Sequence, residues 1–130
     1  MTQQRLNIST GSPWEPIVGY SRAVRIGNVI EIAGTVAVEN GEVVGKGDPY
    51  AQTICILKKI EGVLQEAGAT LQDVIRTRLF VTDISSWEDI GRAHGEFFKD
   101  IRPVTSMLEV SALIDGDYLV EIEVTAVVGL

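Results

Sequence analysis

The fold is decided by the segment Leu119-Val120-Glu121-Ile122-Glu123-Val124-Thr125-Ala126-Val127, along which apolar and polar side chains alternate. A period of two is typical of a β-strand, in which successive side chains point to opposite faces of a sheet. Val120, Ile122 and Val124 therefore share a face that packs on a core. The opposite face carries Glu121 and Glu123, which either meet solvent or line a polar cleft.

A second strand is expected just before this one, over residues 105–110. The two strands are separated by Ile114-Asp115-Gly116-Asp117, whose aspartates and glycine favour a tight reversal. The pattern predicts a β-hairpin of strands 105–110 and 118–128. This pairing would place Thr105 across from Glu121.

A long helix is predicted to begin at Asp48-Pro49. Aspartate caps free backbone N–H groups, and proline is preorganised for the first helical position. An apolar side chain then recurs every three or four residues up to Ala67, and Gly68 fits a left-handed stop. One apolar stripe of this helix is expected to pack on a sheet.

A second helix is predicted to open at Ser85-Ser86-Trp87-Glu88, where a serine stands three residues before a glutamate in the pattern of a capping box. It is expected to run to about Lys99. The residues expected to be buried along it are Trp87, Ile90, Ala93 and Phe97.

The remaining strand signals are short apolar runs bounded by glycine or asparagine. Residues 20–26 and 29–33 are expected to pair as a hairpin, and residues 36–38 and 43–44 flank Asn40-Gly41 as a small flap. Residues 10–16 contain two prolines and a glycine, which predicts a loop. The other predicted elements are strands at 5–9 and 74–82 and a helical turn at 70–73. One face of the strand at 74–82 is expected to carry Ile75, Thr77, Leu79 and Val81.

This order of elements predicts an α+β fold in one domain, residues 1–130, with a mixed or antiparallel sheet and both helices on one face. Two helices cover only one face of such a sheet. The side chains expected to point away from the helices are Met107, Leu119, Val127 and Phe80. An exposed apolar face favours self-association, in which copies of the sheet bury each other in a closed symmetric assembly.

Composition and charge exclude several classes of protein. The formal net charge of -7 has the wrong sign for a general nucleic-acid-binding surface, so no nucleic-acid partner is expected. Neither a run of about 18 apolar residues nor a signal-peptide pattern occurs, so no membrane association is expected. The single cysteine cannot form an internal disulfide, which favours a cytoplasmic location.

Metal and cofactor sites have no sequence signal either. One histidine, His94, and one cysteine, Cys55, cannot build a tetrahedral zinc site, and no carboxylate-rich loop signature is present. The glycines form neither a phosphate-binding loop nor a dinucleotide fingerprint. No metal and no cofactor are therefore predicted. His94 lies in a helical pattern without a marked serine partner, and Cys55 is expected to be a small buried apolar residue.

Several short motifs occur in an order and spacing that are specific in combination. They are Tyr20 with Val24-Arg-Ile-Gly-Asn28, Ile32-Ala-Gly34, Ala51-Gln-Thr53, Phe80-Val-Thr-Asp83, Phe97-Phe98, Arg102-Pro103, Glu109-Val110 and Leu119-Val-Glu-Ile-Glu123. On these motifs the chain resembles the reactive-intermediate deaminase (Rid or YjgF) family over nearly its whole length. The resemblance implies a chorismate-mutase-like α+β protomer that assembles as a homotrimer, with clefts between neighbouring subunits that hold a small-molecule metabolite.

The resemblance also implies which residues form a site. Glu121 matches a glutamate that helps water attack an imine carbon in the deaminating members, and Tyr20 matches a residue of their pocket. Those members grip the substrate carboxylate with an arginine two residues after a proline, but here the motif is Pro103-Val104-Thr105. A threonine hydroxyl cannot replace a bidentate, permanently charged clamp. Thr105 is therefore a candidate ligand contact, and arginine-dependent deamination of 2-imino acids is not expected.

Four further positions are candidates for the same site. Ala33 lies where the deaminating members often have a serine, and Gly91 falls near an asparagine of their pocket. Arg22 and Arg92 are candidates for a displaced anion clamp. All four follow from the resemblance or from residue type, and none from a catalytic motif.

Two hypotheses about function remain open. In the first, an intersubunit cleft hydrolyses an enamine, an imine or a related reactive nitrogen compound, with Glu121 orienting water. In the second, the trimer binds a metabolite or another protein without turnover. Apart from both hypotheses, Glu121 has a purely structural interpretation as a strand carboxylate paired with Arg76 or Arg78. Whether the chain is an enzyme stays open between them. Ribonuclease activity, a label given to some family members, has no support in the acidic balance and the single histidine.

Overall fold

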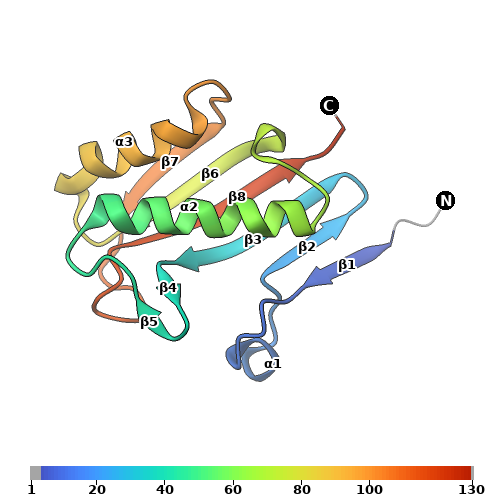
Figure 1. The fold of residues 1–130 in the computed structure, drawn as a ribbon, viewed down its shortest axis with the longest axis horizontal. Helices are drawn as coiled ribbons and strands as arrows, with labels where there is room; N and C mark the ends of the chain where they lie inside the picture. The colour runs from blue at the N-terminus through green and yellow to red at the C-terminus, as the bar shows by residue number, and fades with distance from the viewer. Residues whose placement is uncertain (1–3, 130) are drawn as a thin grey trace.

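The computed structural model describes residues 4–129. Its centre is a six-stranded β-sheet, and the two long helices α2 (Pro49–Glu66) and α3 (Trp87–Phe98) lie side by side on one face of it (Figure 1). This confirms the expected α+β arrangement with a mixed sheet. Met1 to Gln3 and Leu130, which the predicted domain includes, lie outside the described residues. Over residues 4–129, no helix is long and apolar enough to cross a membrane.

The sheet has the strand order β1-β2-β3-β8-β6-β7, and of these described pairs only β6 and β7 run parallel. The bounds are β1 Arg5–Ile8, β2 Ala23–Ile26, β3 Val29–Val36, β6 Val74–Val81, β7 Val104–Glu109 and β8 Val120–Val127. Helix α3 connects β6 to β7, as a crossover between parallel neighbours requires. β8 is the central strand and pairs with β3 on one side and β6 on the other.

The predicted hairpin of residues 105–110 and 118–128 is wrong. β6 lies between β7 and β8 and hydrogen-bonds to both of them. The Asp-Gly signal does mark a local turn, since Tyr118 N donates to Asp115 O at 3.0 Å. However, the turn lies in the connection from β7, at the edge of the sheet, to β8, at its centre. β7 and β8 therefore do not pair with each other.

The alternation predicted for β8 holds along its whole length. Val120, Ile122, Val124 and Ala126 are buried, and the residues between them are half-buried. The helices close this core with Ile56, Leu57, Ile60, Leu64, Ile90 and Phe98. Burial of one such side chain contributes about 1.5–3 kcal/mol. The layer between sheet and helices is therefore the main source of stability.

Helix α2 begins and ends as predicted. Asp48 Oδ1 accepts a hydrogen bond from Ala51 N at 3.0 Å, and Pro49 takes the first helical position. Just beyond the end of the helix, Gly68 has a φ of 85°, a conformation that favours glycine.

The capping box predicted for α3 is wrong. Ser86 precedes the helix without a side-chain hydrogen bond to its first turn. The cap lies earlier, where Asp83 accepts from Ser85 N at 3.0 Å and begins the short 3₁₀ turn η2 (Ile84–Ser86). The start of α3 is therefore exposed, and Trp87 is 56% exposed instead of buried.

A short helix, α1 (Trp14–Val18), overlaps the end of the segment 10–16 that was predicted as a loop. Pro16 falls in its first turn, where a missing N–H costs no hydrogen bond, so the proline does not prevent the helix. The flap is confirmed as β4 (Val38–Glu39) and β5 (Glu42–Val43). The predicted helical turn is confirmed as η1 (Leu71–Asp73).

β6 departs from its predicted alternation only at its start. Its register with β8 shifts just after Val74, and this bulge leaves Ile75 43% exposed. Val74 takes the buried place that was predicted for Ile75. From Thr77 to Val81 the predicted alternation holds.

The face of the sheet away from the helices, here called the outer face, is uncovered in the protomer (Figure 1). Phe80 and Val127 are half-buried, and strand alternation places Phe80 on the outer face as predicted. The prediction for Met107 and Leu119 is wrong, because both pack against the core. For Met107 the reason is its register, which pairs it with the buried Leu79.

Candidate functional site

Glu121 lies on β8 with its side chain toward the outer face. The pairing of β3 with β8 shifts after Ile32, so Ala33 and Gly34 form a bulge beside Glu121. A Cβ atom at position 34 would lie 2.7 Å from Glu121 Cδ and 2.8 Å from its Oε2. The carboxylate therefore packs directly over the Gly34 backbone, where a larger residue would push it away.

Arg22 holds this bulge in place. Its Nη1 donates to Gly34 O at 2.7 Å, to Thr35 Oγ1 at 3.1 Å and to Ala33 O at 3.5 Å. Its guanidinium also lies over the ring of Tyr20, with Cζ 5.7 Å from the ring centroid, which is a cation–π distance. Three of the predicted site residues, Tyr20, Arg22 and Ala33, thus gather around the bulge that Glu121 contacts.

The two arginines considered as displaced anion clamps both have partners. The Nη1 group of Arg22 is committed to the bulge. Arg92 lies on α3, where its Nη1 is 3.3 Å from Asp89 Oδ1 and its Cζ is 4.5 Å from the centroid of the Tyr50 ring. In both arginines one Nη group is therefore already engaged within the protomer.

The carboxyl of Glu121 is electrostatically distinct from that of Glu123. Burial raises the pKa of Glu121 above its ordinary value and the charge of Glu123 raises it further, while Arg22 opposes both. The ion pair considered for Glu121 is made by its neighbour instead, since Arg78 Nη2 lies 2.6 Å from Glu123 Oε1. A half-buried carboxyl with a raised pKa is suited to give and take a proton during a reaction.

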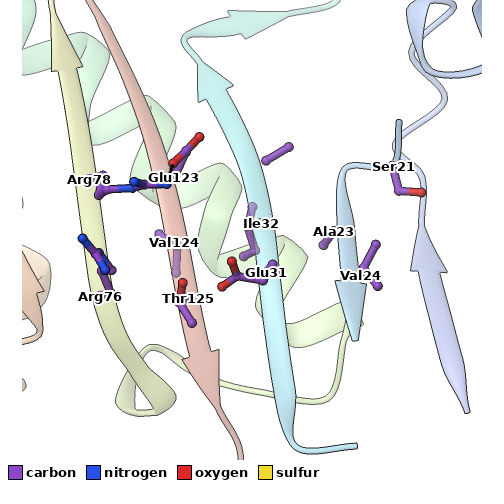
Figure 2. A pocket seen from close by; sticks show the side chains of 11 residues that line it. Ser21, Ala23, Val24, Glu31, Ile32, Arg76, Arg78, Glu123, Val124 and Thr125 are labelled. Carbon is purple, nitrogen blue, oxygen red and sulfur yellow. Dashed lines mark hydrogen bonds and ion pairs between the residues drawn. The ribbon is translucent and has the colours of Figure 1, made fainter. Parts of the chain in front are cut away.

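Further along the outer face is a shallow groove of about 380 Å³. Figure 2 shows it running across β6, β8, β3 and β2. Its polar lining side chains are Arg76, Arg78, Glu123, Thr125, Glu31 and Ser21, and Ala33 borders it as well. Because both signs of charge occur in it, the groove is polar without being a dedicated anion or cation site.

Thr105 lies on the other face of the sheet. It pairs with Thr77 of β6, which is fully buried. Thr105 Oγ1 is 2.8 Å from Thr77 Oγ1 and 3.0 Å from Pro103 O, and Thr77 Oγ1 is 2.9 Å from Nε2 of His94 on α3. The prediction that Thr105 lies across from Glu121 is wrong, since in one protomer the two residues are on opposite faces.

Gly91 lies on α3, three residues before His94 and on the same side of the helix. A Cβ atom at this position would meet nothing within 4 Å. The glycine therefore leaves open space where a side chain would fit.

Gly34, Thr77 and His94 were not among the predicted site residues. A signal existed for Gly34, because a glycine inside a strand often marks a bulge or the close approach of another group. Thr77 and His94 gave no such signal, since their contact joins a strand to a helix through packing.

Other reactive groups contribute little. Cys55 is buried, and burial raises the pKa of its thiol, which keeps it protonated and unreactive. Among residues 4–129, no group of three or more His, Cys, Asp or Glu side chains is placed to hold a metal ion.

Comparison with known proteins identifies relatives over most of the chain. A protein-family model described as Endoribonuclease L-PSP matches residues 10–128. An uncharacterized protein of Streptomyces coelicolor is 40% identical over 119 residues, which cover 92% of this chain and 89% of that protein. A protein of Acinetobacter baylyi named 3-aminoacrylate deaminase RutC is 33% identical over 113 residues, which cover 86% of this chain and 88% of that protein.

Solved structures have the same fold. A Mycobacterium tuberculosis protein described as a member of the YjgF/YER057c/UK114 family is 51% identical with a TM-score of 0.88, and the match covers 96% of this chain and 100% of that one. A Yersinia pestis protein of the conserved Rid family is 34% identical with a TM-score of 0.86, over 96% and 100% of the two chains. From its motifs, its fold and these matches, the chain belongs to the Rid/YjgF family.

Proposed function

We propose that this protein hydrolyses an imine, an enamine or a related small carbon–nitrogen compound in a cleft between two subunits of a homotrimer. The observation that carries the proposal is the carboxyl of Glu121, which is packed over Gly34 with a raised pKa and stands outside the ion pair of its neighbour. The Acinetobacter relative is named a deaminase, which is the same class of reaction.

The geometry of one protomer supports a site that two copies share. Glu121 lies on the outer face and Thr105 on the helix face, so one protomer cannot bring both to the same ligand. The uncovered outer face also carries Phe80 and the 44% exposed Leu108. A second copy seated on this face would bury apolar surface and bring its own residues to Glu121.

We propose a homotrimer because the family resemblance implies this assembly. We propose one domain per subunit over residues 1–130 and a cytoplasmic location. The location is supported by the single cysteine, which is buried and requires no oxidising compartment. The net charge of -7 disfavours a nucleic-acid partner, although the matching family model carries an endoribonuclease description.

In the proposed reaction, water adds to the carbon of a C=N bond. Glu121 takes a proton from the water as the oxygen attacks and passes it to the nitrogen, which gives a carbinolamine. Transfer of the hydroxyl proton of this intermediate to its nitrogen then breaks the C–N bond and leaves a carbonyl compound and ammonia. An enamine enters the same path after it is protonated on carbon to give the imine. The ligand contacts that we propose beside Glu121 are Tyr20, Thr105, Ala33 and Gly91, with Arg22 supporting the bulge.

Thr105 argues against a substrate that carries a carboxylate. The relative named for 3-aminoacrylate acts, by that name, on a carboxylate compound. In this chain a hydroxyl stands where a charged clamp is expected, and it supplies neither a second donor nor a positive charge. The preferred substrate is therefore an uncharged imine or enamine.

A second candidate function is a trimer that binds a metabolite or another protein without turnover. It is favoured by the commitment of Arg22 to the bulge and of Arg92 to Asp89, which leaves the cleft without an obvious replacement for the clamp. In this case Glu121 would bind the ligand and not activate water.

The two candidates are separated by supplying two imines. An amino acid oxidase generates a 2-imino acid, an amine oxidase generates an uncharged imine, and the carbonyl product is followed with and without the protein. We expect acceleration with the uncharged imine, and we expect Glu121→Gln to reduce it by about 10²–10⁴-fold, the usual contribution of acid–base catalysis. Glu123→Gln is the matched control, and it should retain most of the activity because Glu123 is ion-paired with Arg78.

Each outcome has a definite meaning. If the protein accelerates the hydrolysis of neither imine, the enzyme proposal is wrong. The binding function would then be supported by a metabolite that raises the melting temperature of wild type but not that of Glu121→Gln or Tyr20→Phe. Activity on the 2-imino acid gained by Thr105→Arg would show that only the clamp is missing. Light scattering tests the assembly, since a monomer at micromolar concentration contradicts a shared cleft.

A further inference from the structure

A continuous chain of hydrogen bonds runs from helix α3 through β6 to β7, elements that lie next to one another in Figure 1. It joins His94 Nε2 to Thr77 Oγ1 at 2.9 Å, Thr77 Oγ1 to Thr105 Oγ1 at 2.8 Å, and Thr105 Oγ1 to Pro103 O at 3.0 Å. His94 at one end is half-buried, Thr77 in the middle is fully buried, and Thr105 is exposed.

The direction of this chain is fixed by its last member. A carbonyl oxygen only accepts, so the hydroxyl of Thr105 donates its one proton to Pro103 O. Thr77 must then donate its own proton to Thr105, and with that proton committed it accepts from His94 Nε2. This is the only assignment that keeps all three hydrogen bonds, and it requires His94 to carry a proton on Nε2.

This direction does not depend on the charge of His94. The imidazole packs against Phe98 with ring centroids 4.7 Å apart and the ring planes tilted by 37°, and burial lowers its pKa. Protonation of the ring would add a proton at Nδ1 and leave the Nε2–H group unchanged. The chain therefore points from His94 to Pro103 in both charge states.

The consequence appears at Thr105. Its proton is committed to Pro103 O, so the exposed hydroxyl has only an acceptor lone pair to offer. Turning the proton toward a ligand would cost the bond to Pro103 and disturb the bond from Thr77. The position where the deaminating members present the donors of an arginine thus presents an acceptor here.

On the basis of the proposed cleft, we propose that His94, acting through Thr77, holds Thr105 as a hydrogen-bond acceptor, so that the cleft selects ligands with an N–H or O–H donor at this point. A primary amide satisfies this condition, whereas a carboxylate places acceptor against acceptor. His94 is thereby a positioning residue that determines specificity without touching the ligand.

The first test is nuclear magnetic resonance of the untagged wild-type protein with ¹⁵N-labelled histidine. His94 is the only histidine in the chain, so its ring signals need no assignment by mutation. Long-range ¹H–¹⁵N correlations distinguish the two neutral tautomers. We expect the proton on Nε2, and a proton on Nδ1 alone would overturn the proposal regardless of any catalytic activity.

The second test measures binding without turnover, by calorimetry, with 2-oxobutanamide and 2-oxobutanoate, which differ only in the amide and carboxylate groups. We expect wild type to bind the amide roughly tenfold more tightly, the usual value of one well-formed hydrogen bond. Thr105→Val and Thr77→Val should remove most of this preference. The conservative variants Thr105→Ser and Thr77→Ser keep the hydroxyls and should retain it.

Equal or tighter binding of the carboxylate by wild type, or no binding of the amide, would overturn the ligand class. A preference that survives Thr77→Val would overturn the role of His94. If the Thr77→Val variant does not fold, the tautomer of His94 in wild type and the comparison of Thr105→Val with Thr105→Ser still test the proposal. Loss of imine hydrolysis with the amide preference intact would instead count against the proposed reaction alone.

Discussion

Two parts of the candidate site are built in opposite ways. The carboxylate region, on the outer face, comprises Glu121, Gly34 and Arg22. The hydroxyl region, between the sheet and α3, comprises Thr105, Thr77 and His94. The first region places a charged group in space left by a missing side chain and supports it with a cation bound to the backbone. The second joins uncharged groups into a directed chain of hydrogen bonds.

The difference shows which changes each region tolerates. The carboxylate region depends on packing and on the cost of burying a charge, so volume and pH should disturb it most. The hydroxyl region depends on the presence and direction of a few protons, so loss of one hydroxyl should matter more than a change of charge. Single substitutions in each region test this difference.

The largest effect is expected from Arg22→Met. It removes the donor that serves Gly34 O, Thr35 Oγ1 and Ala33 O in a partly buried place, and unfolding free energy should fall by about 2–4 kcal/mol because charged donors are lost and acceptors are left unpaired. Urea denaturation measures this. Arg78→Met is the control, since its exposed ion pair with Glu123 should contribute at most about 1 kcal/mol. Equal losses in both variants would mean that Arg22 does not support the bulge.

A somewhat smaller loss is expected from Gly34→Ala, because its Cβ would overlap the Glu121 carboxyl. Because the overlapping atoms are at the far end of a flexible side chain that can move aside, the cost should be about 1 kcal/mol, the low end for overpacking. The double variant Gly34→Ala with Glu121→Ala should recover much of the loss, which a double-mutant cycle measures as coupling. An unchanged stability of the single variant would show that the carboxylate does not pack over Gly34.

Glu121→Gln should change the pH dependence of stability. The folded-state pKa of Glu121 is raised, so its contribution to stability is present below the unfolded value and is lost as pH rises through the folded value. The melting temperature of the glutamine variant should therefore rise relative to that of wild type between pH 4 and pH 8. Glu123→Gln should show a smaller rise, because it removes only the repulsion between the two carboxylates and leaves the buried charge of Glu121. A gain that grows toward acid pH would contradict the burial of the Glu121 charge.

The smallest effect is expected from His94→Gln. Burial lowers the folded-state pKa of His94, so its contribution is present above the unfolded value and is lost as pH falls through the folded value. Wild type should lose stability relative to the variant as pH falls from 7.5 to 5. Thermal melts across this range measure the difference, and an opposite slope would mean that the imidazolium is stabilised in the fold.

Local patterns were sufficient to predict most of the elements and the face of the sheet on which Glu121 lies. The alternation of β8, the Asp48 cap and the apolar stripe of α2 are each settled within a few neighbouring residues, and the structure has them as predicted. The position of Glu121 on a sheet face follows from the same alternation. What the carboxylate contacts there depends on Gly34, which is distant in sequence.

Non-local pairing explains what the sequence could not predict. A turn signal before β8 suggested a hairpin, but the choice between β6 and β7 as its neighbour depends on the crossover through α3. That choice also decides the face of Thr105, since parallel pairing with β6 sets it opposite Thr77. The bulge that exposes Ile75 is likewise a property of two strands together.

Because Glu121 packs over Gly34, substitutions at these two positions should depend on each other during evolution, although the positions are far apart in the chain. A descendant that gained any side chain at 34 would first have to give up or displace the glutamate, whereas one that lost the glutamate would be released from keeping glycine. A side chain at 34 is therefore accommodated most easily once the glutamate at 121 has been lost. Among relatives, a glutamate at 121 should usually be accompanied by glycine at 34, and departures from glycine should be commonest where the carboxylate is absent.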